Sequence, residues 1–307
     1  MIDHLLGTSG SAHNLAYSIL ESMWIPALPF IRGIQELGWK QVNGHKSYLL
    51  GRVRDTGWWY FFPVALAVKT TLPALLLVGI GAVFLTKSSW REKDWVIAAP
   101  VVAGLALVVA CVPSRVDIGV RHILPIYPLF AIIASVGACQ LWIRLRSKQL
   151  GPALVMVLLS WHVIASLRIH PDYLAYFNEI AGQHPERILV VSDLDWGQDL
   201  LRLSAVLKEK RVEQVSIAYS GSADLSRFNL PSFRQLTPHQ HTTGWIAISL
   251  ITLKTGGILT PDDSFTWLEA YKPVCLVGHS IRLYYVADST GSATGQSSAT
   301  SETRNDR

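Results

Sequence analysis

Four long apolar segments constrain the fold of this chain more than any other feature. A helix needs about 20 residues to cross a hydrocarbon core about 30 Å thick. Half of the 307 residues are hydrophobic and only 16% are charged, which is typical of a membrane protein. We therefore predict four membrane-spanning helices within residues 58–168, at Trp58 to Leu85, Trp95 to Val112, Ile118 to Trp142 and Gly151 to Leu167.

Basic residues in the connecting loops predict the orientation. Three follow the first segment and three follow the third, whereas the loop after the second holds only Arg115 and Arg121. The two richer loops should be cytoplasmic, because cytoplasmic loops carry the excess of Lys and Arg. Residues 1–57 and everything after Arg168 then lie outside. We expect a multi-pass protein of the cytoplasmic (inner) membrane with an extracytoplasmic C-terminal domain. The six loop cations are Lys87, Arg91, Lys93, Arg144, Arg146 and Lys148.

Residues 169–286 have the pattern of an α/β domain. Short β-branched runs alternate with amphipathic stretches, the longest covering residues 197–210 and 263–271. Strands separated by helices imply crossover connections and a mainly parallel sheet. The predicted strands are Ile188 to Val191, Val215 to Tyr219, Trp245 to Leu250, Cys275 to Val277 and Ile281 to Val286.

The two ends of the chain have weaker patterns. Residues 1–57 predict an external loop with a surface helix near Asn14 to Trp24, which Pro26 and Pro29 should end. Residues 287–307 are rich in Ser, Thr and Gly without an apolar period, so we expect a disordered tail there.

Charge and cysteine usage narrow the choice of partners. The net charge is +5, but six of the cations belong to the predicted cytoplasmic loops, and no basic stripe alternates with aromatic residues. Anionic lipid is therefore expected as a partner rather than nucleic acid. Cys111, Cys139 and Cys275 show neither a disulfide framework nor zinc spacing, and we expect no metal and no cofactor.

The stretch GVRHILPIYP places Arg121 and His122 at the entrance of the third apolar segment. A guanidinium does not shed its proton to enter lipid, so it needs water or an anion. We expect Arg121 to bind a lipid phosphate through its fork of donors, with His122 as a second donor or a titratable group. The alternative is an interfacial arginine that reaches the lipid headgroups.

Lys69 is a second candidate for binding the phosphate, because it lies deep within the first apolar segment. An ammonium there costs on the order of 3 kcal/mol, and the nearer end of the segment is roughly 16 Å away at 1.5 Å per residue. That distance exceeds the reach of a lysine side chain, so Lys69 should face a polar cavity or a bound anion. Thr70, Thr71 and Pro73 predict a locally loosened helix at this point.

The motif SDLDWGQD, residues 192–199, is a candidate sugar or acceptor site. It lies between a predicted strand and a predicted helix, where open α/β sheets bind ligands. An aromatic ring beside carboxylates and an amide suits a sugar. The alternative is a capped loop in which Asp195 caps the helix and Trp196 packs beneath it. The candidate residues are Asp193, Asp195, Trp196, Gln198 and Asp199.

Two further positions have structural and functional interpretations. The stretch HPDYLAYFNE, residues 170–179, has aromatic residues at helical spacing and predicts an interfacial helix, or else a segment that shapes the mouth of an active site. His162, inside the fourth apolar segment, is expected to bond a neighbouring group rather than to act in catalysis.

Four stretches of the chain, taken in order, resemble the later half of bacterial phospholipid carrier-dependent glycosyltransferases. They are WWYFFPVALAVKTTLP, GVRHILPIYP, HPDYLAYFNE and SDLDWGQDL. These are GT-C membrane enzymes related to protein O-mannosyltransferases and lipid A aminoarabinose transferases. The resemblance covers about residues 40–286. It implies transfer of a sugar from a polyprenyl phosphate to an acceptor on the outer face, usually without a bound metal. It also aligns Arg121 with the arginine of the family's R-(Y/H)-x-L-P entry, which helps to bind the lipid phosphate.

The chain departs from that family in one respect. The family's catalytic aspartate lies in the first external loop, after the first membrane helix, and nothing before Trp58 resembles that helix and loop; Asp3 is an isolated acid. We therefore assign no catalytic residue, and expect a carboxyl-terminal fragment, a mis-started reading frame or one half of a split enzyme that needs its upstream half. The alternative is a non-enzymatic membrane-anchored subunit that binds glycan or a partner protein. A transporter is less favoured, because no paired carboxylates lie within the predicted spans.

Overall fold

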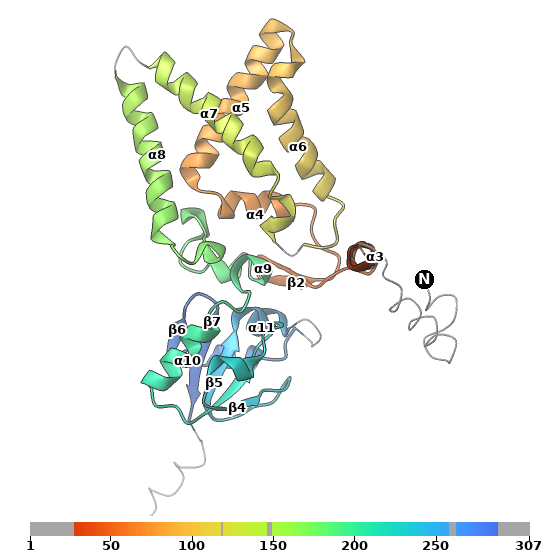
Figure 1. Ribbon diagram of the computed structural model, residues 1–307, viewed down its shortest axis with the longest axis vertical. Helices are drawn as coiled ribbons and strands as arrows, with labels where there is room; N and C mark the ends of the chain where they lie inside the picture. Colours follow the sequence, from red (N-terminus) through yellow and green to blue (C-terminus); the bar gives the residue numbers. More distant parts are fainter. Residues whose placement is uncertain (1–27, 118, 146–148, 258–261, 288–307) are drawn as a thin grey trace, which may run out of the picture. The chain divides into compact units, whose positions relative to one another are not determined.

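The computed structural model describes residues 28–117, 119–145, 149–257 and 262–287, and the chain forms two compact units, residues 1–44 and 45–307 (Figure 1). In its described part the first unit contains helix α3 (Leu28–Asn43), which the sequence patterns did not predict. Pro29, expected to end a helix, lies in the first turn of α3, where the missing N–H costs no intrahelical hydrogen bond. The surface helix predicted near Asn14 to Trp24 lies outside the described residues.

A β-hairpin opens the second unit, where a loop was predicted. Strands β1 (Ser47–Leu49) and β2 (Arg52–Arg54) pair antiparallel, and Leu49 lies opposite Arg52. Leu50 and Gly51 both have positive φ, as a tight two-residue hairpin turn requires. Successive strand residues point to opposite sides. Tyr48 accordingly packs in the core of the α/β domain. Leu49 packs in a second core, which includes Phe61, Phe62 and Ile126 and is called here the core below the apolar helices.

The first predicted span is in fact two helices: the predicted loosening at Thr70, Thr71 and Pro73 is a complete break, so the prediction of a single spanning helix is wrong. Helix α4 (Phe61–Lys69) ends where Thr70 and Thr71 adopt extended conformations, and α5 (Leu72–Glu92) begins directly after them. Pro73 is the physical reason. It has no N–H to donate to the carbonyl of Lys69, and its ring would clash with that carbonyl in a continuous helix.

Three helices are long and apolar enough to span a membrane, namely α5, α7 (Ile126–Arg144) and α8 (Leu150–Arg168). They match the first, third and fourth predicted segments in part or in full. The second segment is shorter than expected: helix α6 (Ala99–Cys111) has 13 residues and follows the 3-10 turn η1 (Trp95–Ala98). The third segment begins with the 3-10 turn η2 (Val120–Ile123), and α7 starts only after Pro125.

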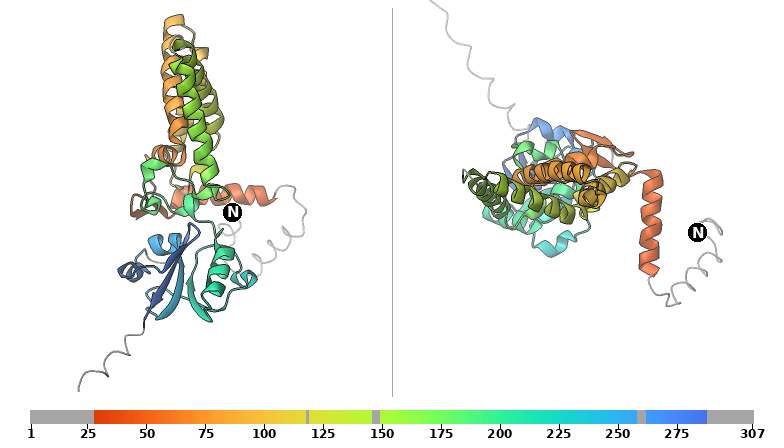
Figure 2. Two further views of the ribbon diagram at one scale, coloured as in Figure 1. Left: turned by 90° about the vertical axis from the view of Figure 1, so that its left-hand side faces the viewer. Right: turned by 90° about the horizontal axis from the view of Figure 1, so that it is seen from above.

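Helices α5 and α7 cross at two glycines, and both views show them running side by side (Figures 1 and 2). A Cβ on Gly81 would overlap the backbone carbonyl of Ile133, and one on Gly137 would overlap that of Leu77. Small residues let helix backbones approach closely, and close packing rather than the hydrophobic effect holds membrane helices together. These two glycines therefore set the distance between α5 and α7.

The α/β domain is built on a five-stranded sheet in the order β4-β3-β5-β7-β6. Strand β3 is parallel to β4 and β5, whereas β7 is antiparallel to β5 and β6. The prediction of a mainly parallel sheet is therefore wrong. The turn from β6 to β7 is too short for a crossover, so these strands pair antiparallel. The strands are β3 (Gln214–Ala218), β4 (Ser232–Gln235), β5 (Gly244–Ser249), β6 (Cys275–Val277) and β7 (Ile281–Val286).

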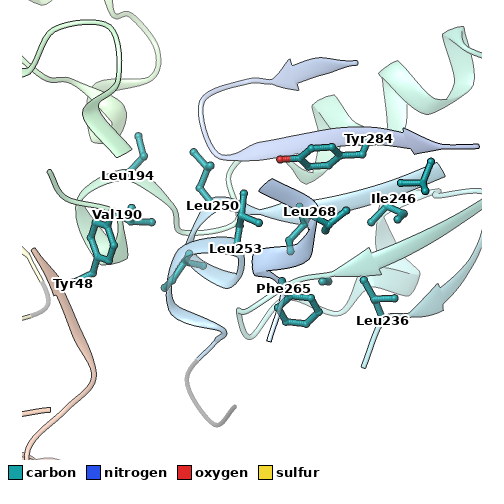
Figure 3. Packing of buried hydrophobic residues seen from close by; sticks show 14 of the residues in the cluster. Tyr48, Val190, Leu194, Leu236, Ile246, Leu250, Leu253, Phe265, Leu268 and Tyr284 are labelled. Carbon is teal, nitrogen blue, oxygen red and sulfur yellow. The ribbon is translucent and has the colours of Figure 1, made fainter. Parts of the chain in front are cut away.

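Both faces of the central strands β3, β5 and β7 are covered, whereas the residues of the edge strand β4 are exposed. Helix α10 (Leu200–Glu209) packs Leu200, Leu203 and Leu207 on one face, and α11 (Leu250–Thr255) with the 3-10 turn η8 (Thr266–Ala270) packs on the other. Figure 3 shows the second of these cores, in which Tyr48 of the hairpin joins residues of the sheet and of α11. The predicted helices over 197–210 and 263–271 thus correspond to α10 and to the shorter η8.

The strand predicted at Ile188 to Val191 does not form. Helix α9 (Val191–Leu194) begins there instead, and Leu189 and Val190 are almost fully buried. Leu189 belongs to the core below the apolar helices, and Val190 belongs to a core of the α/β domain. This run is apolar because it passes between two cores and not because it lies in a sheet.

Candidate functional site

A cavity of about 430 Å³ lies between α5, α7 and α8, the three helices that are long enough to span a membrane. Aliphatic and aromatic side chains such as Leu77, Phe130 and Leu159 form most of its wall. The polar lining residues come from the first turns of α5 and α7, the last turns of α8 and the segments next to them. They are Lys69, Thr70, Thr71, Tyr127, His162, Ser166, Tyr173 and Tyr176.

Hydrogen bonds between helices order this polar end. The Thr71 hydroxyl lies 2.7 Å from Nδ1 of His162, and the Thr70 hydroxyl lies 3.2 Å from the hydroxyl of Tyr127. The prediction that His162 bonds a neighbouring side chain is confirmed. The hydroxyl of Tyr176 is buried and has no hydrogen-bond partner among the described residues. Because buried polar groups are normally hydrogen-bonded, this hydroxyl is available to a ligand in the cavity.

Lys69 lies at the end of α4, where the helix break turns it towards the α/β domain. Its Nζ donates to the backbone carbonyls of Leu174 and Asp193, each at 2.7 Å, and lies 4.3 Å from the ring centre of Phe177. Burial lowers the pKa of Lys69 to about 8, although the nearby Asp193 carboxylate favours the charged form. An ammonium has three N–H donors. One of them therefore has no oxygen acceptor among the described residues.

Asn178 fixes the break between α4 and α5. Its Nδ2 donates to the carbonyls of Ala67 and Thr70, and its backbone N–H donates to Val68. A helix end leaves its last carbonyls without intrahelical partners. Asn178, only 3% exposed, supplies those partners and so positions Lys69.

The segment that carries Asn178 is not the interfacial helix predicted for residues 170–179. It contains the 3-10 turns η4 (Tyr173–Ala175) and η5 (Glu179–Ala181), separated by extended residues. The side chain of Asn178 bonds the N–H of Ile180 and the carbonyls of α4, which competes with regular helix. Tyr173 and Tyr176 instead line the cavity.

Asp193 joins the two predicted phosphate-binding regions. Its carboxylate accepts the backbone N–H of Val120 at 2.9 Å, next to Arg121, while its carbonyl accepts Lys69. Burial raises the pKa of Asp193, against the effects of Lys69, the Val120 N–H and Arg121. With 3% exposure, the Asp193 side chain orders this junction rather than presenting itself to a ligand.

Arg121 and Trp196 lie against each other. The guanidinium carbon of Arg121 is 4.8 Å from the centre of the indole ring, and neither residue lines the cavity. Trp196 is 60% exposed, so the prediction that it packs beneath the following helix is wrong. His122 is exposed as well, and partial burial of its ring, together with Arg121 and His45, lowers its pKa.

Asp195 and Gln198 hold the loop that presents Trp196. The Asp195 carboxylate accepts the N–H of Gly197, while Gln198 accepts the N–H of Trp196 and donates to the carbonyl of Leu194. Burial raises the pKa of Asp195 to about 6. Asp195 does not cap α10, because the residue that precedes this helix is Asp199.

Asp199 belongs to a charged network inside the α/β domain. Its fully buried carboxylate accepts the N–H groups of His279 and Ser280 and the hydroxyl of Ser280. Arg202 bridges Asp199 to Asp172 at 2.7 and 2.9 Å. The candidate sugar-site motif therefore splits: its three aspartates are buried, and Trp196 is its exposed aromatic residue.

Comparisons of the chain with protein-family models, with curated proteins and with solved structures gave no match. The structure itself contains three helices that are long and apolar enough to span a bilayer, as in a membrane protein, and a mixed α/β domain. Within the described residues no group of three or more His, Cys, Asp or Glu side chains is arranged to hold a metal ion.

Sequence reasoning missed Asn178 and Tyr127. In the sequence, Asn178 stands out only as part of an aromatic-rich motif, because the carbonyls to which it donates lie more than 100 residues upstream. Tyr127 had a visible signal: it is a polar-tipped aromatic residue between two prolines at the start of an apolar segment.

Proposed function

We propose that this protein is a membrane glycosyltransferase, or the carboxyl-terminal half of one, that moves a sugar from a polyprenyl-phosphate donor to an acceptor on the outer face of the membrane. The cavity between α5, α7 and α8 is the observation that supports the proposal. Its walls are apolar, and its polar groups gather at one end. A ligand with a long apolar chain and one polar end matches that distribution.

Lys69 supports a phosphate at the polar end. Two of its N–H groups are held by carbonyls, which fixes the direction of the third. A preorganised cation stabilises negative charge as it develops on a departing phosphate. The buried Tyr176 hydroxyl adds a donor in the same lining. In this proposal Arg121 and His122 assist from the entrance of α7.

The proposal includes a topology. In this topology, α6 and the 3-10 turn that precedes it (Trp95–Cys111) cross the membrane in addition to α5, α7 and α8. Their 17 residues have a length of roughly 25 Å. The loops richer in Lys and Arg lie in the cytoplasm. The Lys69 end of the cavity and the α/β domain then face the outside of the inner membrane, where a lipid-linked sugar meets its acceptor.

The lipid-binding half of the proposal is tested with the purified chain in lipid nanodiscs and a photoreactive polyprenyl phosphate. We expect cross-links at residues that line the cavity, and at least a tenfold weaker labelling in Lys69→Met, since a charge-assisted hydrogen bond is lost. Lys87→Met, which removes an exposed cation at the other end of α5, is the matched control and should label normally. Equal labelling of both variants would contradict the proposed phosphate position.

The catalytic half is tested by transfer of radiolabelled sugar from a polyprenyl phosphate, with the chain supplied alone and together with the product of the sequence upstream of it. We expect transfer that Arg121→Ala abolishes. If the lipid binds but no sugar is transferred in either case, the alternative of a non-enzymatic membrane-anchored subunit that binds glycan or a partner is favoured.

A further inference from the structure

One side of helix α3 is apolar and exposed. Ile34, Gly38 and Val42 follow one another at intervals of four residues, which places them in one row along the helix. Ile34 is 54% exposed and Val42 is 70% exposed, and a Cβ on Gly38 would meet nothing within 4 Å. These three residues are called here the apolar row. Within the part of the chain that the structure describes, the apolar row is uncovered.

The other side of α3 is polar. Glu36 and Lys40 lie one turn apart and form an ion pair of 2.7 Å, and the exposed Asn43 follows on the same side. At 3.6 residues per turn, these polar residues lie about half a turn away from the apolar row. A helix with one apolar side and one polar side suits the boundary between water and an apolar phase.

Trp39 lies at the flank of the apolar row, between the apolar and the polar side, and is 64% exposed. A single exposed apolar residue needs no explanation, but several that adjoin one another indicate an interaction surface. Tryptophan is enriched at the boundary between lipid and water, because its ring is apolar and its N–H is polar. The position of Trp39 therefore favours lipid as the partner of the apolar row.

The chain keeps α3 within reach of a membrane surface. Only three residues separate Asn43, at the end of α3, from Ser47, at the start of β1, and they span at most about 14 Å. Leu49 of β1 packs in the core below the apolar helices, which includes Ile126, the first residue of α7. Helix α7 is long and apolar enough to span a membrane, so this core lies at one end of a candidate span.

We infer that α3 lies in the surface of the lipid bilayer, with the apolar row turned to the acyl chains and Glu36 and Lys40 turned to water. The charged residues of α3 are Arg32, Glu36 and Lys40, a net charge of +1. Attraction to anionic lipid is therefore small, and burial of the apolar row and of Trp39 supplies most of the attachment. The inference goes beyond the proposed sugar transfer and does not depend on it.

Fluorescence quenching on the full chain in nanodiscs tests the position of α3. A nitrobenzoxadiazole label is attached to one introduced cysteine at a time, in a chain whose three native cysteines are serine. A nitroxide on the lipid should quench labels on the apolar side at least about threefold more than labels on the polar side, and dissolved iodide should show the reverse order. The label sites are Ile34→Cys and Val42→Cys on the apolar side and Glu36→Cys and Asn43→Cys on the polar side.

Matched variants test whether the apolar row causes the attachment. With the label at residue 34, Val42→Glu should reduce quenching by the lipid nitroxide by at least about threefold, because it places a charge among the acyl chains. Asn43→Glu adds the same charge on the polar side and should leave the quenching unchanged. Nanodiscs of phosphatidylcholine alone and of an equal mixture with phosphatidylglycerol should differ by less than about twofold. Circular dichroism of each variant shows that it folds.

Two patterns of quenching would overturn the inference. Iodide quenching that is equal on the two sides of α3 would show that the helix lies in water. Labels at residues 34 and 42 that neither quencher reaches would show that protein covers the apolar row, either another part of the chain or a second copy. Labels on the apolar side that the lipid nitroxide reaches in a chain that transfers no sugar would sustain the position of α3 and count only against the enzyme.

Discussion

The ammonium of Lys69 donates a 2.7 Å hydrogen bond to the backbone carbonyl of Asp193, a residue 124 positions further along the chain. The bond joins the end of α4 to α9, and the carboxylate of the same aspartate holds the segment before Arg121. The apolar helices and the α/β domain therefore meet at a point where a buried cation, a buried carboxylate and the entrance of α7 depend on each other.

The charge state of Lys69 should control phosphate binding. Burial lowers its pKa to about 8 from an ordinary 10.5, so its charge is lost as the pH rises through about 8. Affinity for polyprenyl phosphate, measured in nanodiscs, should fall by roughly tenfold between about pH 7 and about pH 9.5. Lys69→Arg keeps its charge and should lose much less affinity over this range.

The same shift predicts a pH dependence of stability with the opposite sign. Between about 8 and 10.5 the unfolded chain binds the Lys69 proton while the folded protein has released it. Stability from this group therefore rises with pH across that window.

For the affinity measurement, a fall in polyprenyl-phosphate affinity that Lys69→Arg fails to prevent would assign the effect to a different titrating group.

Removing the side chain of Asn178 should destabilise the break between α4 and α5. In Asn178→Ala the carbonyls of Ala67 and Thr70 lose their donors in a buried position, at an expected cost on the order of 2 kcal/mol. The measurement is thermal unfolding in detergent. Asn43→Ala is the control, because its amide bonds Trp39 from an exposed position and should cost less than about 0.5 kcal/mol. Equal effects would contradict the role assigned to Asn178.

The glycine crossing of α5 and α7 should tolerate no side chain. A methyl group at Gly81 would overlap the carbonyl of Ile133, so Gly81→Ala should destabilise the protein by on the order of 2 kcal/mol or more. Gly79→Ala, two residues away on the same helix, meets nothing within 4 Å and should be neutral or slightly stabilising. Melting temperatures of the two variants make the comparison, and a stable Gly81→Ala protein would show that the helices cross elsewhere.

Replacing Asp195 with asparagine should stabilise the protein at neutral pH. Burial raises the pKa of Asp195 to about 6 from an ordinary 3.8, so the folded protein holds the proton more tightly than the unfolded chain. Stability from this group falls as the pH rises between these values, and Asp195→Asn removes the cost of the buried charge, on the order of 2 kcal/mol. Denaturation near pH 7 should show the gain, which should vanish near pH 4 because Asp195 is then protonated. A loss of stability near pH 7 that disappears near pH 4 would mean instead that the charged form is needed.

The apolar segments were the most predictable part of the fold. A run of about 20 apolar residues has few alternatives to a spanning helix, and α5, α7 and α8 match such runs. The break before α5 was foreshadowed by Thr70, Thr71 and Pro73, but its sharpness depends on Asn178, which is distant in sequence. The edge strand β4 was missed because all four of its residues are exposed and it carries no apolar period.

The candidate site was predictable in its residue types and not in its geometry. Asp193, Asp195 and Asp199 appear in sequence as a cluster of carboxylates open to a ligand. Each is buried in the structure, and the backbone N–H donors to Asp193 and Asp199 come from residues 120, 279 and 280. Local sequence contains no sign of such distant backbone donors. The exposed Trp196 and its contact with Arg121 likewise follow from tertiary structure alone.

Two consecutive residues of the first hairpin strand belong to different cores: Tyr48 packs in the core of the α/β domain, and Leu49 packs in the core below the apolar helices. Recombinant production of the α/β domain from residue 169 onward would therefore leave a hole where the tyrosine ring belongs and should yield an aggregation-prone product. A soluble version suited to crystallisation or ligand screening would have to supply the hairpin in trans or join it through a linker.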